Sequence, residues 1–182
     1  MVTATALVPL AVLLAWEAAV IKDLRCAFKT EMPGFCGLIR KAHKVNVKTM
    51  LNLNGTLLEG VRKNLIEADD ALIAVLRKKN KSELLAPLGK ALESENHALS
   101  ELKVSCKEHE TDSGCRPGSR GLTRSTLTLI KAIKMVVDEN QNKTIIAAED
   151  EFTKAGENKT ELIQGFASKV LEAIKSKNAT SK

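Results

Sequence analysis

The chain carries five Asn-x-Ser/Thr triplets, each of which can accept an N-linked glycan. The acceptors are Asn54, Asn80, Asn142, Asn158 and Asn178. With ten asparagines in the chain and about one residue in eight a Ser or Thr, chance would supply about one such triplet. Glycan transfer takes place in the secretory pathway. The excess of acceptors therefore predicts a secreted, extracellular glycoprotein, although it does not say which acceptors carry sugar.

Four cysteines offer a second kind of chemistry, the formation of disulfides. They are Cys26, Cys36, Cys106 and Cys115. An even number in a secreted chain predicts two disulfides, and three pairings are possible. Pairing Cys26 with Cys36 and Cys106 with Cys115 is favoured because each pair brackets a turn. The rival pairing would tie the N-terminal hairpin to the middle of the chain and would close longer loops, so the sequence leaves the choice open.

A metal site is the alternative use of two of these cysteines. His109 lies between Cys106 and Cys115 in a Cys-x2-His-x5-Cys arrangement, which supplies three ligands of the types that zinc prefers. No fourth ligand accompanies them, and oxidised cysteines are expected in a secreted chain. We therefore expect no metal.

Catalytic signals are weak. His43 and His97 each lie alone among helical residues and are expected to be solvated, as are the carboxylates of Asp69-Asp70 and Glu149-Asp150-Glu151 on Lys-rich helix faces. The chain has no His-Glu-x-x-His, no Gly-x-Ser-x-Gly and no phosphate-binding Gly loop. We expect a protein that is not an enzyme and that uses no cofactor.

The N-terminal segment is typical of a signal peptide. Its apolar core, Ala6 to Ala15, has the usual length of roughly 7–15 residues and is too short to span a bilayer before Glu17. We expect residues 1–19 to be a cleaved signal peptide and residues 20–182 to form a single helical-bundle domain. A buried N-terminal helix of a cytosolic protein is the alternative, which the acceptors and cysteines argue against. No later apolar run predicts a transmembrane segment.

Composition and periodicity predict the elements that position these groups. The chain has no Tyr and only four Phe, while Leu, Ala, Lys and Glu dominate, a composition that favours helices over strands. Apolar residues recur every three or four positions along 47–75, 85–102, 122–152 and 163–174, and Glu95 is the one charged member of the second stripe. We predict an all-α fold: an antiparallel bundle of about four helices plus a short N-terminal disulfide-closed hairpin.

Charge suggests what the surface binds. The net charge is +6, and cationic residues gather at 77–79 and in a predicted polar loop, 107–121, rich in Gly and charge. We expect Arg116 and Arg120 in this loop to contribute to a partner-binding surface, and Arg124 lies close by. An extracellular protein or an anionic glycan fits such a surface. Nucleic acid does not, because the chain lacks aromatic residues on which bases could stack.

These expectations combine into a functional hypothesis. The chain is predicted to act by binding an extracellular macromolecule, as a modulator, an inhibitor or a surface ligand. The alternative is a carrier of small apolar ligands in the bundle interior, because the Leu, Ile and Val stripes lack bulky aromatics that would fill a cavity. The identity of the partner and the oligomeric state are left open.

Overall fold

The computed structural model describes most of the chain beyond its N-terminal segment. The described residues are 19–21, 24–53, 59–108, 114–156 and 159–176. The predicted signal peptide, apart from its last residue, lies outside them, as do His109 and three of the five glycan acceptors: Asn54, Asn158 and Asn178.

Six α-helices of 16 to 24 residues and one short 3-10 helix make up nearly all of the described structure, which contains no strand. Their bounds are α2 Phe35–Asn52, α3 Glu59–Arg77, η2 Lys81–Glu83, α4 Leu85–Glu108, α5 Cys115–Lys134, α6 Glu139–Lys154 and α7 Lys159–Lys175. The prediction of an all-α fold is confirmed.

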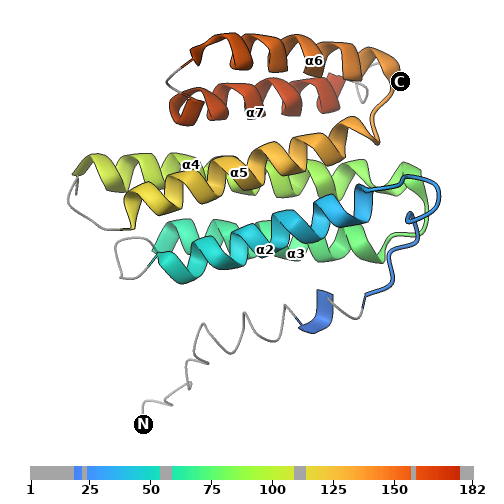
Figure 1. The fold of residues 1–182 in the computed structure, drawn as a ribbon, viewed down its shortest axis with the longest axis horizontal. Helices are drawn as coiled ribbons and strands as arrows, with labels where there is room; N and C mark the ends of the chain where they lie inside the picture. The colour runs from blue at the N-terminus through green and yellow to red at the C-terminus, as the bar shows by residue number, and fades with distance from the viewer. Residues whose placement is uncertain (1–18, 22–23, 54–58, 109–113, 157–158, 177–182) are drawn as a thin grey trace.

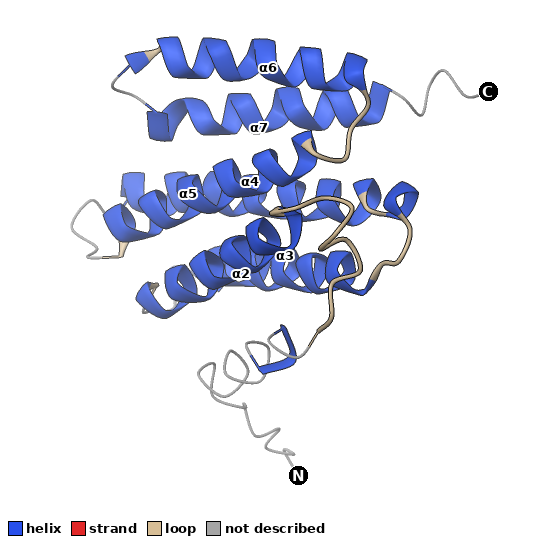
Figure 2. Ribbon diagram, turned by 45° about the vertical axis from the view of Figure 1, so that its right-hand side comes forward, coloured by secondary structure: helices blue, strands red, loops and turns tan. Residues whose placement is uncertain are grey.

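The helices α2 to α5 form an antiparallel four-helix bundle. In Figure 1, α2 and α5 lie side by side nearest the viewer, and α3 and α4 lie behind them. The contacts agree, because α2 packs on α3 and α5 while α4 packs on α3 and α5. The hairpin of α6 and α7 lies to one side of this bundle, and α7 makes its contacts with α4 and α5 (Figure 2). The predicted bundle is therefore present with a helical hairpin added to it.

The predicted stripes form the core. Leu65 and Leu72 of α3, Leu92 of α4 and Leu129 of α5 are fully buried, and each such side chain contributes about 2 kcal/mol through removal of its apolar surface from water. Packing of these stripes against one another, rather than helix propensity alone, holds the bundle together.

The stripe over residues 122–152 is divided between two helices. Between them, Asp138 caps α6: its Oδ1 accepts a hydrogen bond from the Gln141 backbone N–H at 2.8 Å, and its own N–H donates to Gln141 Oε1 at 3.1 Å. This capping box starts a new helix at α6, because it satisfies backbone groups that have no partner within the helix. The residues of the stripe therefore belong to two helices.

The predicted polar loop 107–121 is wrong in extent. The helix α4 continues to Glu108, and α5 begins at Cys115, so Arg116 and Arg120 lie on a helix rather than in a loop. Pro117 is compatible with this because it lies in the first turn, where its missing N–H has no intrahelical partner to lose. The glycines of this segment, which suggested a loop in the sequence, lie with Pro117 in or directly before the first turns of α5.

Close approach of α5 to α2 explains two of these glycines. A Cβ atom added at Gly118 would lie 2.9 Å from Leu53 Cδ2, and one added at Gly121 would lie 2.0 Å from Thr49 Oγ1. At Gly118 the terminal methyl group of Leu53 would have to shift, and at Gly121 the side chain of Thr49, which is also 3.1 Å away at its Cβ atom, would have to move. The lack of a Cβ atom at Gly121 therefore permits the close packing of the two helices.

Candidate functional site

The most distinctive surface of the protein is formed by the outward sides of α2 and α5. Seven cationic residues are exposed on these two helices, and we call them the basic face: Lys41, Lys44, Lys48, Arg116, Arg120, Arg124 and Lys131. They include both arginines that the sequence analysis singled out. The structure places Arg116 and Arg120 one turn apart on α5 and brings them onto the same layer as the lysines of α2.

Helical periodicity puts the two sets of cations on one side of the molecule. In α2, the exposed lysines recur at intervals of three and four residues, opposite the buried residues Ile39, Asn46 and Met50. In α5, the arginines recur every four residues, opposite the buried Leu122 and Leu129. The buried side of α2 packs on α5 and α3, and that of α5 packs on α2 and α4, so the exposed cations of both helices lie on the outside of the bundle.

Neither of the two helices that carry this surface contains an acidic residue. The sequence contains no Asp or Glu between Glu31 and Glu59, nor between Asp112 and Asp138, and these two gaps contain the whole of α2 and α5. The acids of the described helices therefore lie on α3, η2, α4, α6 and α7. Segregation of charge between neighbouring helices produces a positive potential over one side of the bundle.

No described residue neutralises the cations of the basic face through an ion pair. Two further cations of α2 and α5 are occupied: Lys134 pairs with Glu149 of α6, and Arg40 Nη2 donates to the Leu24 backbone oxygen at 2.9 Å. Lys134 and Arg40 therefore stabilise the fold, whereas the seven cations of the basic face form no ion pair with a described residue.

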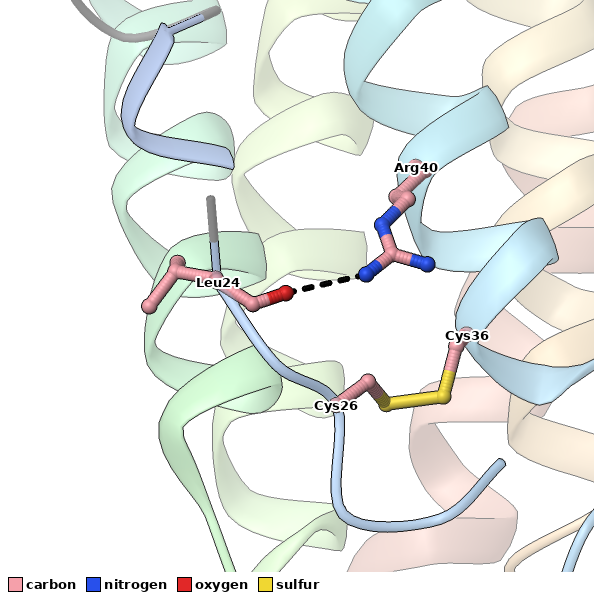
Figure 3. Close-up of a disulfide and its surroundings, with 4 residues drawn as sticks. All are labelled: Leu24, Cys26, Cys36 and Arg40. Atoms are coloured by element: carbon pink, nitrogen blue, oxygen red, sulfur yellow. Dashed lines mark hydrogen bonds between the residues drawn. A yellow bond between two sulfur atoms is a disulfide. The ribbon is translucent and has the colours of Figure 1, made fainter. Parts of the chain in front are cut away.

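The contact of Arg40 belongs to the N-terminal disulfide-closed segment. Cys26 and Cys36 are bonded, which fastens the chain preceding α2 to the first turn of that helix, and Arg40 reaches back to Leu24 in the same segment (Figure 3). Phe28 and Phe35 pack edge to face with ring centroids 6.0 Å apart inside this closure. Together these contacts fix the start of α2 and hence the positions of its lysines.

The second disulfide fixes the start of α5. Cys106 near the end of α4 is bonded to Cys115, the first residue of α5, with Cα atoms 5.8 Å apart. Arg116 follows directly. Both disulfides are the local pairings favoured by the spacing, and because both cysteines of this pair are oxidised, they are not thiolate ligands for zinc.

Two glycan acceptors fall in the described structure. Asn80 is exposed in the connection before η2, and Asn142 is half-buried in the first turn of α6. Asn80 holds the N-cap position of η2, but its side chain accepts no capping hydrogen bond. None of the five acceptors lies within α2 or α5, so the basic face carries no glycosylation signal of its own.

A layer of polar side chains crosses the centre of the bundle, and Glu95 is the one member of it that the apolar stripes reveal. Asn46 Nδ2 of α2 donates to Asp69 Oδ1 of α3 at 3.2 Å and to Glu95 Oε1 of α4 at 3.0 Å. From α5, Ser125 Oγ donates to Glu95 Oε1 at 2.7 Å and Thr126 Oγ1 donates to Glu95 Oε2 at 3.1 Å. The carboxyl group of Glu95 thereby joins α4 to α2 and α5, and the amide of Asn46 extends the layer to α3.

Two expectations about solvation are wrong for members of this layer. His43 is 4% exposed and Asp69 is fully buried, whereas its neighbour Asp70 is exposed. His43 Nδ1 lies 3.2 Å from Asp69 Oδ2, within ion-pair distance. This contact cannot be predicted from the sequence, because it forms only when α2 packs against α3 in the folded bundle. His97 is exposed, as expected.

Burial governs the protonation of the two carboxyl groups. Removal from water raises the pKa of Glu95 from its ordinary 4.5 to about 7, against the lowering effect of the three hydrogen bonds it accepts. Burial also raises the pKa of Asp69, which the hydrogen bond and charge of His43 and the hydrogen bond of Asn46 oppose. Because these groups are inaccessible to solvent, we assign them to the architecture of the bundle rather than to chemistry on a substrate.

Other types of site are not found in the described part of the chain. Its His, Cys, Asp and Glu side chains form no group of three or more that could hold a metal ion. None of its helices combines the length and the apolar character that crossing a bilayer requires.

Comparison with known proteins finds no matching family model, no significantly similar curated protein and no significantly similar solved structure. The basic face must therefore be interpreted from its own chemistry.

The sequence analysis identified the arginines of the basic face but missed its lysines. Lys41, Lys44 and Lys48 were not singled out because they are separated from Arg116 and Arg120 by about 70 residues. The sequence does contain one indication of these lysines: the segments that form α2 and α5 both lack acidic residues.

Proposed function

We propose that this protein is secreted and N-glycosylated and acts by binding an extracellular macromolecule through the basic face. The observation that carries the proposal is the set of seven exposed cations on α2 and α5, with no acid on either helix and no ion pair to a described residue. Charged groups that the fold leaves unpaired on one side steer an oppositely charged partner to that side.

Features outside the basic face support the cellular location. Two disulfides suit an oxidising compartment, and the glycan acceptor Asn80 lies on the surface where a sugar can be attached. Expression of the full chain in a eukaryotic secretory host tests this part. Intact mass of the protein in the medium, before and after deglycosylation, should show loss of the leader, attached sugar and four oxidised cysteines. An unprocessed protein that stays in the cells would refute it.

Binding is tested with two variants of equal net charge. In the face variant, Lys44, Lys48, Arg120 and Arg124 are each replaced by Gln. In the control variant, Lys63, Lys90, Lys103 and Lys154 are replaced by Gln; these four are also exposed but lie on α3, α4 and α6.

Labelled wild-type protein and the control variant should bind extracellular matrix prepared from the source organism, and the face variant should not. Equal retention of all three proteins would contradict the proposal. Circular dichroism establishes that each variant is folded, since the replaced side chains are exposed and take no part in the core.

The structure does not favour the carrier hypothesis. An apolar ligand in the bundle would have to displace the layer formed by Asn46, Glu95 and Ser125, which are hydrogen-bonded to one another and would lose partners worth about 1–3 kcal/mol each. A cavity of about 340 Å³ does exist beside η2, but Lys81, Asp138 and Gln141 contribute to its lining. Extraction of lipid from the purified native protein is the direct test of that hypothesis.

A further inference from the structure

We propose that the ligand of the basic face is a linear sulfated polysaccharide that lies along the paired helices α2 and α5. This inference rests on the proposed function and specifies the chemistry of its partner. The reasoning concerns the spacing of the cations, the side chains that accompany them, and the distribution of acids over the rest of the protein.

The cations are spread along a line rather than gathered in a pocket. At a rise of 1.5 Å per residue, the segment from Arg116 to Lys131 of α5 spans about 22 Å, with Arg120 and Arg124 between its ends. The lysines of α2 run beside it for about 10 Å, from Lys41 to Lys48, because the two helices are packed together. A single phosphate or carboxylate would engage one or two of these groups, whereas a polyanion with charges along its length engages them all.

The basic face lacks the aromatic side chains that nucleic acids require. All four Phe residues of the chain are buried, with exposed fractions between 0% and 8%, and the chain has no Tyr. Single-stranded nucleic acids bind to grooves in which bases stack on aromatic rings. A sugar chain recognised through its sulfate groups needs only cations and hydrogen-bond donors.

The basic face also lacks the apolar side chains that membranes and folded proteins require. Of the large hydrophobic residues that are strongly exposed, only Leu51 lies on α2 or α5, at the end of α2. Surface-binding helices insert an apolar side into the lipid interface, and protein interfaces have an apolar centre with few charged groups. A face dominated by Lys and Arg fits neither partner.

The acids on the other helices disfavour binding of a polyanion there. Exposed carboxylates such as Glu67 and Asp70 of α3 and Glu101 of α4 lie on helices outside the α2 and α5 layer. They repel a polyanion that strays from the basic face, and none of the five glycan acceptors lies within the two helices to obstruct it.

The test measures binding of the glycosylated, disulfide-bonded protein to immobilised heparin over a range of salt concentrations. Association of cations with a polyanion releases counterions, so the logarithm of the association constant falls linearly with the logarithm of the salt concentration, with a slope close to the number of contacts. Replacing Lys44, Lys48, Arg120 and Arg124 by Gln should reduce the magnitude of this slope by about 3 and weaken binding at least tenfold. The charge-matched control variant should retain the wild-type slope.

Competing ligands show whether the sulfated sugar itself is recognised. Polyglutamate and vesicles containing an anionic phospholipid should bind at least tenfold more weakly than heparin at the same salt concentration. Equal binding to either one, or equal slopes for the two variants, would overturn the inference.

A matrix experiment distinguishes this failure from failure of the proposed function. Enzymatic digestion of sulfated polysaccharides in the matrix should abolish retention of the wild-type protein. Retention that survives digestion but is still lost in the face variant would sustain the proposed function and refute a sulfated sugar as the ligand. Retention that is equal in the face variant and the control variant would refute both.

Discussion

Replacing Glu95 by Gln should stabilise the protein at neutral pH and much less in mild acid. Glu95 is fully buried and accepts hydrogen bonds from Asn46, Ser125 and Thr126. Glutamine has nearly the same shape and carries no charge. Its amide oxygen can accept the bonds from Asn46 and Ser125, while Thr126 can turn its hydroxyl to accept from the amide nitrogen.

The size of the effect follows from the raised pKa. Burial moves the pKa of Glu95 from 4.5 to about 7, so between these values the folded protein holds a proton that the unfolded chain has lost. The free energy of unfolding is therefore highest below pH 4.5, falls as the pH rises to 7, and is constant above, with a total loss of about 3 kcal/mol from this group. The Gln variant does not incur this loss.

Urea denaturation followed by circular dichroism, at intervals from pH 5 to pH 8, measures the difference. The free energy of unfolding of the Gln variant minus that of the wild type should be about 1 kcal/mol at pH 5 and reach about 3 kcal/mol at pH 8. Subtraction removes the contribution of Asp69, whose raised pKa acts in the same direction in both proteins. Glu101→Gln, at an exposed position of the same helix, is the control. A difference that does not change with pH would refute a buried, titrating Glu95.

Two further predictions concern the elements that position the basic face. Gly121→Ala should lower the free energy of unfolding by about 1–3 kcal/mol, because the new Cβ atom would lie 2.0 Å from Thr49 Oγ1 and force α5 away from α2. The control is Gly165→Ala, which has no atom within 4 Å of its added Cβ and should raise the free energy of unfolding by about 0.5–1 kcal/mol. Equal effects of the two substitutions would argue against the close helix contact. Replacing both Cys106 and Cys115 by Ser should cost about 2–3 kcal/mol through the chain entropy of the opened loop, measured by urea denaturation, whereas an unchanged free energy of unfolding would mean that the disulfide does not constrain the unfolded chain.

Helices were the part of this structure that the sequence could predict. Apolar residues at intervals of three and four, such as Leu65 and Leu72 of α3, follow from local geometry and require no knowledge of partners. The two disulfides were also favoured correctly because each bridges a short segment. The capping box at Asp138 was missed because the apolar stripe continues on both sides of it, so the periodicity suggests one helix where two are present.

The polar layer and the basic face could not be assembled from the sequence, because both depend on which helices become neighbours. Glu95 interrupts a Leu stripe visibly, but its partners Asn46 and Ser125 come from helices 49 and 30 residues away. In the same way, Lys44 and Arg124 form one surface only because α2 packs on α5. Arg116 and Arg120 were singled out as candidates, but they were assigned to a loop that the structure shows as helix.

Lysine footprinting of the wild-type protein tests the central claim most directly. The folded protein is acylated with a lysine-reactive reagent, once free in solution and once bound to extracellular matrix of the source organism, and the rate of modification at each lysine is measured by mass spectrometry. On the basic face, Lys41, Lys44, Lys48 and Lys131 should be modified more slowly in the bound state. The exposed lysines of the other helices, Lys63, Lys90, Lys103 and Lys154, should react at the same rate in both states. Protection of this second group, or equal rates at every lysine, would contradict a binding surface on α2 and α5.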